Sequence, residues 1–229
     1  MKKDNLYNES PVKEDLGTSV VPEITETALE LEVEPEQAVN FVLGGSEPGP
    51  DMQEMESGLS IQDSLIYFVG VVDEFSLLDF MAKTRTVLKN RPEEMAKEPI
   101  SVIIDSSGGD VYSTLGIVDF IENLAVPVNT IARGRCMSAA AIILACGTGE
   151  RRASKRTSMM LHNSSGGSIG TAKEIRINIE HHDKLDNELY SILADRTKKD
   201  EAWWKDALRN DLYINSETAL ELGIIDSIG

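Results

Sequence analysis

From residue 65 onward, short apolar runs alternate with segments in which apolar residues recur at helical spacing. The runs of strand length, rich in β-branched residues, lie at 65–72, 100–105, 128–132, 157–162, 212–214 and 224–226. Helical spacing covers 76–88, 112–124, 138–145, 171–197 and 216–223, the last with Ser216 as its expected cap and Gly223 as its terminator. This alternation predicts an α/β fold in which parallel strands are joined by helices that pack outside the sheet.

The first 60 residues have a different character. They hold 14 acidic residues against three lysines, a net charge of −11 out of −17 for the whole chain, and they carry five of the eight prolines. A strongly acidic segment with few apolar residues cannot bury enough surface to fold alone. We therefore predict a largely disordered acidic extension over 1–60 and a folded domain over 61–229, with a propeptide or a partner-docking arm as the alternative for the extension.

Composition excludes several classes of protein. Two cysteines in 229 residues cannot build a disulfide framework. The longest apolar run, 139–146, is too short to cross a membrane, and no apolar core follows Lys2 and Lys3 as it would in a signal peptide. The acidic balance argues against nucleic acid as a partner. We expect a cytoplasmic protein that binds neither membrane nor nucleic acid.

Candidate chemistry gathers where the predicted strands end, at 105–110, 132–138 and 162–170. In open parallel sheets, sites form at the carboxyl ends of strands. Ser138 opens an apolar helix whose first amides could meet a developing oxyanion, although serine is also a common helix cap. Gly108 and Gly109 follow a buried strand and allow either a tight turn or the close approach of a ligand to the backbone.

His162 lies at the tip of a strand and beside a glycine-rich loop, where it could act as a general base. His181 and His182 lie among charged residues in mid-helix, and we interpret them as surface residues. No pair of residues has the spacing of a strong zinc motif, so we expect no metal and no cofactor. An acid should orient the base, and the residues alone leave seven candidates open: Asp183, Asp186, Asp195, Asp200, Asp206, Asp211 and Asp226. Cys136 either lines this site or is a small buried packing residue.

Four ordered blocks make residues 65–229 resemble the proteolytic subunit of the Clp protease family. The blocks are IDSSGGDVYSTLGIVDFI, GRCMSAAAIILACG, SMMLHNSSGGSIGTA and NDLYINSETALELGIIDSI. Four blocks in the family's order are far more specific than any one motif. The resemblance implies a Clp/crotonase-like spiral of βαβ units and a peptidase that acts on polypeptide substrates.

The resemblance also implies roles for individual residues. Ser138 would be the nucleophile, His162 the base and Asp211 the orienting acid, with the amides of Gly109 and Ala139 as the oxyanion hole. Substrate-binding positions would be Gly108, Gly166, Gly167 and Ser168, beside which an extended peptide could pair as an added strand. The family implies a homo-oligomer, as a heptameric or stacked ring, that works with an ATP-dependent unfoldase of the AAA+ class.

Three alternatives stay open. The blocks GGDV, SAAA and MMLHN are also similar to Clp-like proteases of tailed phages, which act in head maturation without an unfoldase. A catalytically silent ring subunit would scaffold active copies, but it has no chemical need for Ser138, His162 and Asp211 together. An acyl-CoA enzyme on the same spiral fold would commonly use glutamates for acid–base chemistry instead of a serine and a histidine.

Overall fold

Three long parallel strands form the centre of one mixed sheet: β2 (Leu65–Val72), β3 (Ile100–Gly109) and β4 (Val128–Met137). The computed structural model describes residues 57–229, so most of the predicted acidic extension lies outside the described residues. Within the described part, Leu59–Ser60 form β1, which pairs antiparallel with β2. The sheet order is β1-β2-β3-β4-β5-β8. The predicted α/β architecture is confirmed.

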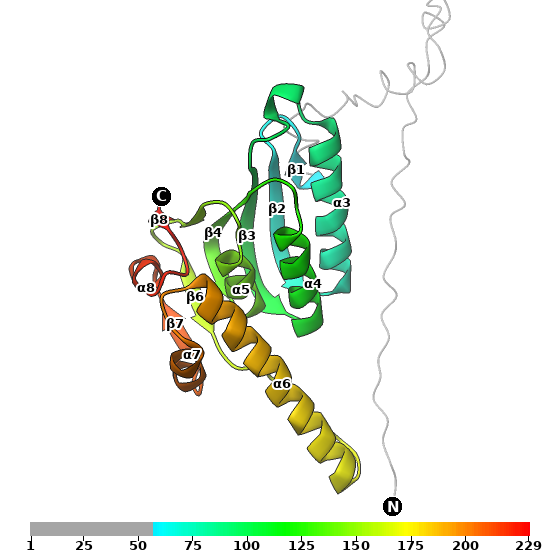
Figure 1. Ribbon diagram of the computed structural model, residues 1–229, viewed down its shortest axis with the longest axis vertical. Helices are drawn as coiled ribbons and strands as arrows, with labels where there is room; N and C mark the ends of the chain where they lie inside the picture. The colour runs from blue at the N-terminus through cyan, green and yellow to red at the C-terminus, as the bar shows by residue number, and fades with distance from the viewer. Residues whose placement is uncertain (1–56) are drawn as a thin grey trace, which may run out of the picture. The chain divides into compact units, whose positions relative to one another are not determined.

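Strand β4 divides the sheet in two (Figure 1). Its first half pairs with β5 (Arg151–Ala153), which in turn pairs with β8 (Ser227–Ile228). Its second half pairs with β6 (Ser158–Leu161), and β7 (Leu212–Ile214) adds to β6 in the antiparallel direction. The fork brings the ends of β4, β6 and β7 together, although residues 137 and 212 are far apart in the sequence.

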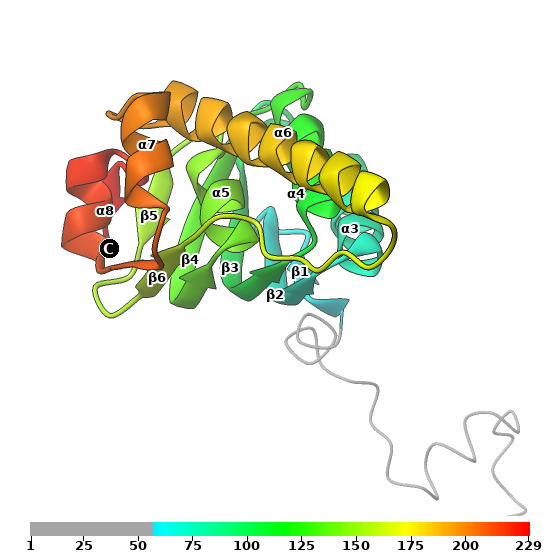
Figure 2. The ribbon, with the colours of Figure 1, turned by 90° about the horizontal axis from the view of Figure 1, so that it is seen from below.

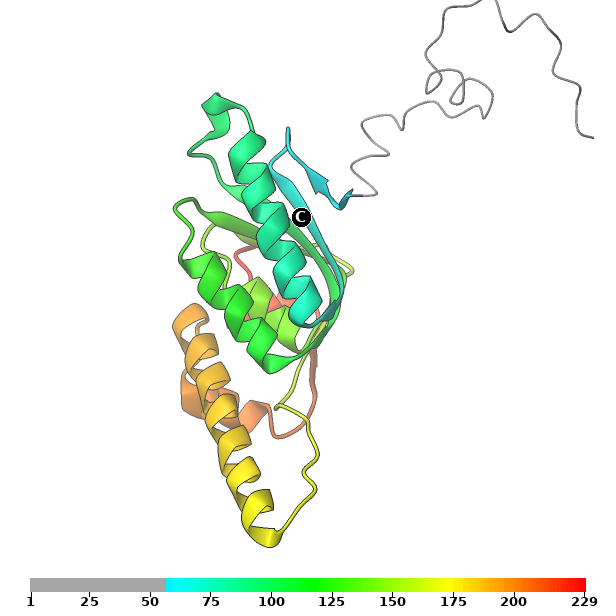
Figure 3. The same ribbon diagram turned by 90° about the vertical axis from the view of Figure 1, so that its right-hand side faces the viewer.

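The helices α3 (Glu74–Asn90), α4 (Val111–Glu122), α5 (Ala139–Ala145) and α6 (Ala172–Arg196) lie on one side of the central strands (Figure 2). Every residue of α5 is buried, because its alanines let it approach β3 and β4 closely. The long helix α6 extends beyond the sheet, with the segment that leads into it running alongside (Figure 3). The remaining elements are a 3₁₀ turn at Glu93–Met95, α7 (Glu201–Ala207) and α8 (Ser216–Leu222). Within residues 57–229, no helix combines the length and the apolar character that a membrane crossing needs.

Two segments that we predicted as loops are strands. Residues 105–109 continue β3, and residues 132–137 continue β4, with a break in the register between Ile104 and Ser106. The pattern misled us because the two arginines and the glycine of 133–135 lie at exposed strand positions, where no apolar residue is needed.

The prediction of a strand at 224–226 is wrong. Gly223 ends α8 in the left-handed conformation, as expected, with φ 82°. Ile224 and Ile225 are buried, and both amides donate to the carbonyl of Ala219, so this apolar pair closes the helix end instead of pairing in the sheet. The cap of α8 is Asn215, because Ser216 is buried and donates its hydroxyl to the carbonyl of Ser154.

The carboxyl-terminal segment is joined to the sheet by an ion pair between Arg151 and Asp226. The guanidinium donates to both carboxylate oxygens, at 3.0 Å from Nε and 2.5 Å from Nη2, and its other nitrogen donates to the carbonyl of Arg196. These bonds hold the pKa of Asp226 below its ordinary value. A carboxyl with a lowered pKa in the folded state stabilises the fold above its unfolded pKa, and this contribution is lost as the pH falls through the folded pKa.

We therefore expect Asp226→Asn to lower the melting temperature at pH 7. The difference from the parent protein should shrink as the pH falls below about 4, where the parent carboxyl also becomes protonated. Thermal denaturation at a series of pH values between 7 and 3 measures this. A difference that stays constant, or that grows toward acid, would show that the ion pair does not contribute in this way.

Candidate active site

The backbone holds Ser138 in an unusual conformation at the junction of β4 and α5. Its φ is 53°, in the left-handed region that residues other than glycine rarely adopt. Its amide donates to the carbonyl of Met160 at 2.6 Å, which joins the junction to β6. Such strain costs about 1–3 kcal/mol and persists only where the surrounding structure enforces it. The hydroxyl makes no capping bond to the first turn of α5, so Ser138 is not an ordinary helix cap.

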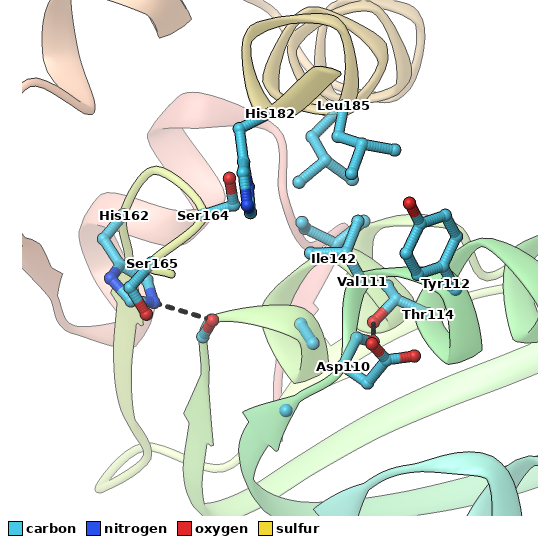
Figure 4. Close-up of a pocket in the computed structure, with 14 residues that line it drawn as sticks. Asp110, Val111, Tyr112, Thr114, Ile142, His162, Ser164, Ser165, His182 and Leu185 are labelled. Carbon is cyan, nitrogen blue, oxygen red and sulfur yellow. Dashed lines mark hydrogen bonds between the residues drawn. The ribbon is translucent and has the colours of Figure 1, made fainter. Parts of the chain in front are cut away.

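The hydroxyl of Ser138 meets the ring of His162 instead. Oγ of Ser138 and Nε2 of His162 are 2.8 Å apart (Figure 4). His162 follows directly after β6, so the pairing of β4 with β6 brings the two side chains together. A hydroxyl bonded to an imidazole nitrogen is the arrangement from which a proton can pass to the ring as the oxygen attacks.

Asp211 lies on the other side of the His162 ring. Its Oδ1 is 3.9 Å from Nδ1 of His162, which is an ion-pair distance and longer than a hydrogen bond. Of the seven candidate acids, Asp211 alone has an oxygen within 4.0 Å of either ring nitrogen in the described chain. The antiparallel pairing of β6 with β7 brings Asp211 there. Leu161 pairs with Leu212, His162 follows Leu161, and Asp211 precedes Leu212.

The first residue of the glycine pair packs directly against the serine. A Cβ on Gly108 would lie 2.5 Å from the carbonyl oxygen of Met137 and 2.9 Å from the amide nitrogen of Ala139. A Cβ on Gly109 would lie 2.1 Å from the carbonyl oxygen of Val72. Both positions therefore require glycine: at Gly108 it lets β3 reach the junction that carries Ser138, and at Gly109 it lets β3 pack against the end of β2. Gly109 and Ala139 line the same pocket as Ser138, so the two expected oxyanion-hole residues lie at the candidate site.

This pocket has a volume of about 170 Å³ and lies between α4, α5, α6 and the segment after β6. Its apolar wall consists of Val111, Ala139, Ile142, Leu185 and Leu189, and its polar lining includes Asp110, Tyr112, Thr114, Ser164, Ser165 and His182. His182, which we interpreted as a surface residue, is partly exposed, and its ring also lines this pocket from α6 (Figure 4). His181, by contrast, is exposed, and Nε2 of its ring is 2.5 Å from the hydroxyl of Tyr112.

The segment between His162 and α6 is held against the helix at its start. The amide of Ser164 donates to Asp186, and the hydroxyl of Tyr190 donates to the side chain of Asn163. Burial raises the pKa of Tyr190, and the nearby Asp186 acts in the same direction, so this hydroxyl stays protonated as the donor. Of the expected substrate-binding residues, Gly166 lies beside His182, since a Cβ there would be 2.9 Å from Cε1 of the ring, and Ser168 accepts a hydrogen bond from Asn178. A Cβ on Gly167 would meet no atom within 4 Å.

Both cysteines lie away from the pocket and are buried. Cys136 belongs to β4 with its side chain in the core, which confirms it as a packing residue. Burial raises the pKa of the Cys136 thiol far above its ordinary value and that of Cys146 to about 12. Neither residue is a thiolate at neutral pH, and the thiolate is the reactive form.

We therefore expect the folded protein to resist thiol reagents at pH 7.5. Ellman's reagent should release almost no thionitrobenzoate from native protein, and two equivalents per chain in guanidinium chloride. Rapid release of one equivalent from native protein, accompanied by loss of any hydrolytic activity, would place a reactive thiol at the site and contradict this account.

Comparisons with known proteins identify relatives of this chain. The family model for Clp protease matches residues 62–229. A protein of Bacteroides thetaiotaomicron named ATP-dependent Clp protease proteolytic subunit is 33% identical over 170 residues, which cover 73% of this chain and 75% of that protein. A protein of the same name from Bacteroides fragilis is 38% identical over 132 residues, with 56% of this chain and 63% of that protein covered. The ATP-dependent Clp protease proteolytic subunit 1 of Prochlorococcus marinus is 36% identical over 130 residues, or 56% of this chain and 67% of that protein.

Proposed function

Since this chain belongs to the Clp protease family and is a Clp-type peptidase, we propose that it cleaves polypeptides by serine chemistry, with Ser138 as the nucleophile. The observation that carries this proposal is the 2.8 Å contact between Oγ of Ser138 and Nε2 of His162. The strained backbone of Ser138 presents its hydroxyl to the imidazole, and this hydroxyl makes no capping bond to α5. The same contact favours an active subunit over a silent scaffold.

The proposed reaction begins when His162 accepts the proton of Ser138 as Oγ attacks the peptide carbonyl. The amides of Gly109 and Ala139 stabilise the negative oxygen of the tetrahedral intermediate. His162 then donates its proton to the departing amine, which leaves an acyl-enzyme. Water hydrolyses the acyl-enzyme in the same manner, with His162 again acting first as base and then as acid. Asp211 favours the tautomer that carries its proton on Nδ1. The lone pair of Nε2 then faces the serine.

We propose further that the chain acts in a ring of identical copies with an ATP-dependent partner of the AAA+ class. The support comes from the names of its relatives, which describe proteolytic subunits of an ATP-dependent protease. These relatives favour that assembly over the alternative of a phage head maturation protease that needs no unfoldase.

A fluorophosphonate probe tests the serine chemistry directly. The probe should form one covalent adduct per chain, and peptide mapping by mass spectrometry should place it on Ser138. The Ser138→Ala variant should form none. A protein that cleaves peptides while the probe modifies another residue, or modifies none, would overturn the proposal.

The role of Asp211 predicts the effect of Asp211→Asn. An amide can donate to Nδ1 of His162 and favour the tautomer that has no lone pair facing Ser138. We expect kcat/KM for a fluorogenic peptide to fall by about 10²-fold, less than the ~10⁴-fold of a buried triad acid, because the Asp211 side chain is 58% exposed and 3.9 Å away. Asp206→Asn, at an exposed position on α7, is the matched control and should leave kcat/KM unchanged. Equal activity of the parent and Asp211→Asn would remove Asp211 from the mechanism.

A further inference from the structure

Two polar side chains of the pocket beside Ser138 are at least partly buried and have no hydrogen-bond partner within the described chain. His182 lines it, and neither of its ring nitrogens has a hydrogen-bond or ion-pair partner among residues 57–229. The hydroxyl of Ser164 also lines the pocket, is buried, and has no partner. Buried polar groups are nearly always hydrogen-bonded, so the unpaired Ser164 hydroxyl indicates that a ligand completes its bonding, and the half-buried His182 ring that lines the same pocket is open to that ligand.

The imidazole is held in place by its surroundings. It extends from α6 toward the segment after His162, with Ser164 on one side and Leu185 on the other (Figure 4). A Cβ on Gly166 would lie 2.9 Å from Cε1 of His182, so glycine at this position leaves room for the ring. The hydrogen bond that the backbone amide of Ser164 donates to the carboxylate of Asp186 holds the Ser164 side of the pair. The two polar groups are therefore positioned before a ligand arrives.

The other residues that line the pocket restrict the polarity and the charge of the ligand. Val111, Ile142 and Leu185 offer an apolar wall to methylene groups. Most other polar groups at the pocket are already paired. Asp110 accepts from the amide and hydroxyl of Ser113, the hydroxyl of Thr114 donates to the carbonyl of Asp110, and Tyr112 bonds to His181. No lysine or arginine lines this pocket in the described chain, so it offers no fixed positive charge to a carboxylate.

On the basis of the proposed function, we propose that His182 and Ser164 make this pocket selective for a long, uncharged side chain that ends in an amide, namely glutamine, on the residue whose carbonyl Ser138 attacks. The methylenes of glutamine fit the apolar wall. The amide of glutamine offers N–H donors and a carbonyl acceptor. A neutral imidazole and a hydroxyl together also offer donors and acceptors, so they can pair with these groups. Methionine has a similar length but leaves both groups unpaired, and glutamate would enter beside the Asp110 carboxylate with no lysine or arginine as a counter-charge.

The test uses fluorogenic peptides that differ only in the residue before the cleaved bond, which is glutamine, methionine or glutamate. For the parent protein, we expect kcat/KM for glutamine to exceed that for methionine by about tenfold, the effect of one to two hydrogen bonds, and to exceed that for glutamate as well. His182→Leu should lower kcat/KM for glutamine and raise it for methionine, so that the ratio falls to about 1 or below. Ser164→Ala should lower the ratio about threefold.

The matched control is Asp183→Leu. Asp183 follows His182 on α6, is exposed, and does not line the pocket, so its replacement should leave the ratio as in the parent. Because the ratio compares two substrates of one variant, a partly folded preparation does not change it. A parent ratio of 1 or below, or an unchanged ratio in His182→Leu, overturns this inference while the proposed function stands. Failure to cleave any of the peptides, together with a Ser138 that is inert to a fluorophosphonate, overturns both.

Discussion

Replacing Ser138 with alanine should lower kcat for peptide hydrolysis by about 10⁶-fold, to the residual level that binding and the oxyanion amides supply in serine peptidases. The variant should fold, because the hydroxyl makes no capping bond to α5 and its contact with His162 is partly exposed. Alanine must also adopt the left-handed backbone conformation of Ser138, so we expect a small loss of stability and no gain.

The measurement is steady-state hydrolysis of a fluorogenic peptide alongside a thermal melt. Ser158→Ala is the matched control, because Ser158 is exposed on β6 and its hydroxyl makes no hydrogen bond in the described chain. The control should retain the parent rate. Substantial hydrolysis by a folded Ser138→Ala variant would show that another group performs the attack.

Gly108→Ala should have the second largest effect, although residue 108 has no side chain to take part in the reaction. The new Cβ would lie 2.5 Å from the carbonyl oxygen of Met137 and 2.8 Å from Cβ of Ser138, and the φ of 85° is strained for alanine. The backbone must move at the junction that carries both Ser138 and the amide of Ala139. We expect kcat/KM to fall by about 10³-fold, because a shift of about 1 Å at a reacting group costs about 10²-fold and a lost oxyanion donor costs about as much or more.

Gly116→Ala on α4 is the matched control for this glycine. Its Cβ would meet the flexible side chain of Leu77 at 3.0 Å, and alanine is the better helix former, so both activity and stability should persist. Circular dichroism of Gly108→Ala separates a displaced site from an unfolded chain. A folded Gly108→Ala variant with the parent kcat/KM would show that the close approach of β3 to Ser138 is not needed.

The apolar pattern predicted the elements that bury most surface. It missed a strand with charged residues and a short helix. The runs at 65–72 and 100–105 and the long helix over 171–197 are confirmed as β2, the first part of β3, and α6. Strand β5 escaped prediction because two of its three residues are arginines, and the seven-residue helix α7 escaped because it is short and mostly exposed. Hydrogen bonds to neighbouring strands, which no local pattern records, decide such short edge segments.

At the site, the sequence brought Ser138 and His162 forward as candidates, and their contact needed the forked pairing of β4, which only the structure provides. The seven candidate acids could not be separated by local chemistry, since proximity to His162 depends on the pairing of β6 with β7. His182 had a signal that we missed. The predicted apolar stripe of the long helix has a gap between Ile179 and Leu185, and position 182 falls in that gap at helical spacing.

The most direct test of the central claim is an experimental structure of the assembled protein after reaction with a peptide phosphonate. We predict a covalent bond from Oγ of Ser138 to phosphorus, with one phosphonyl oxygen about 2.7–3.1 Å from the amides of Gly109 and Ala139. The His162 ring should remain beside the serine, with Asp211 as the carboxylate closest to its other nitrogen. An adduct on a different residue, a phosphonyl oxygen turned away from both amides, or a His162 ring remote from Ser138 would contradict the account.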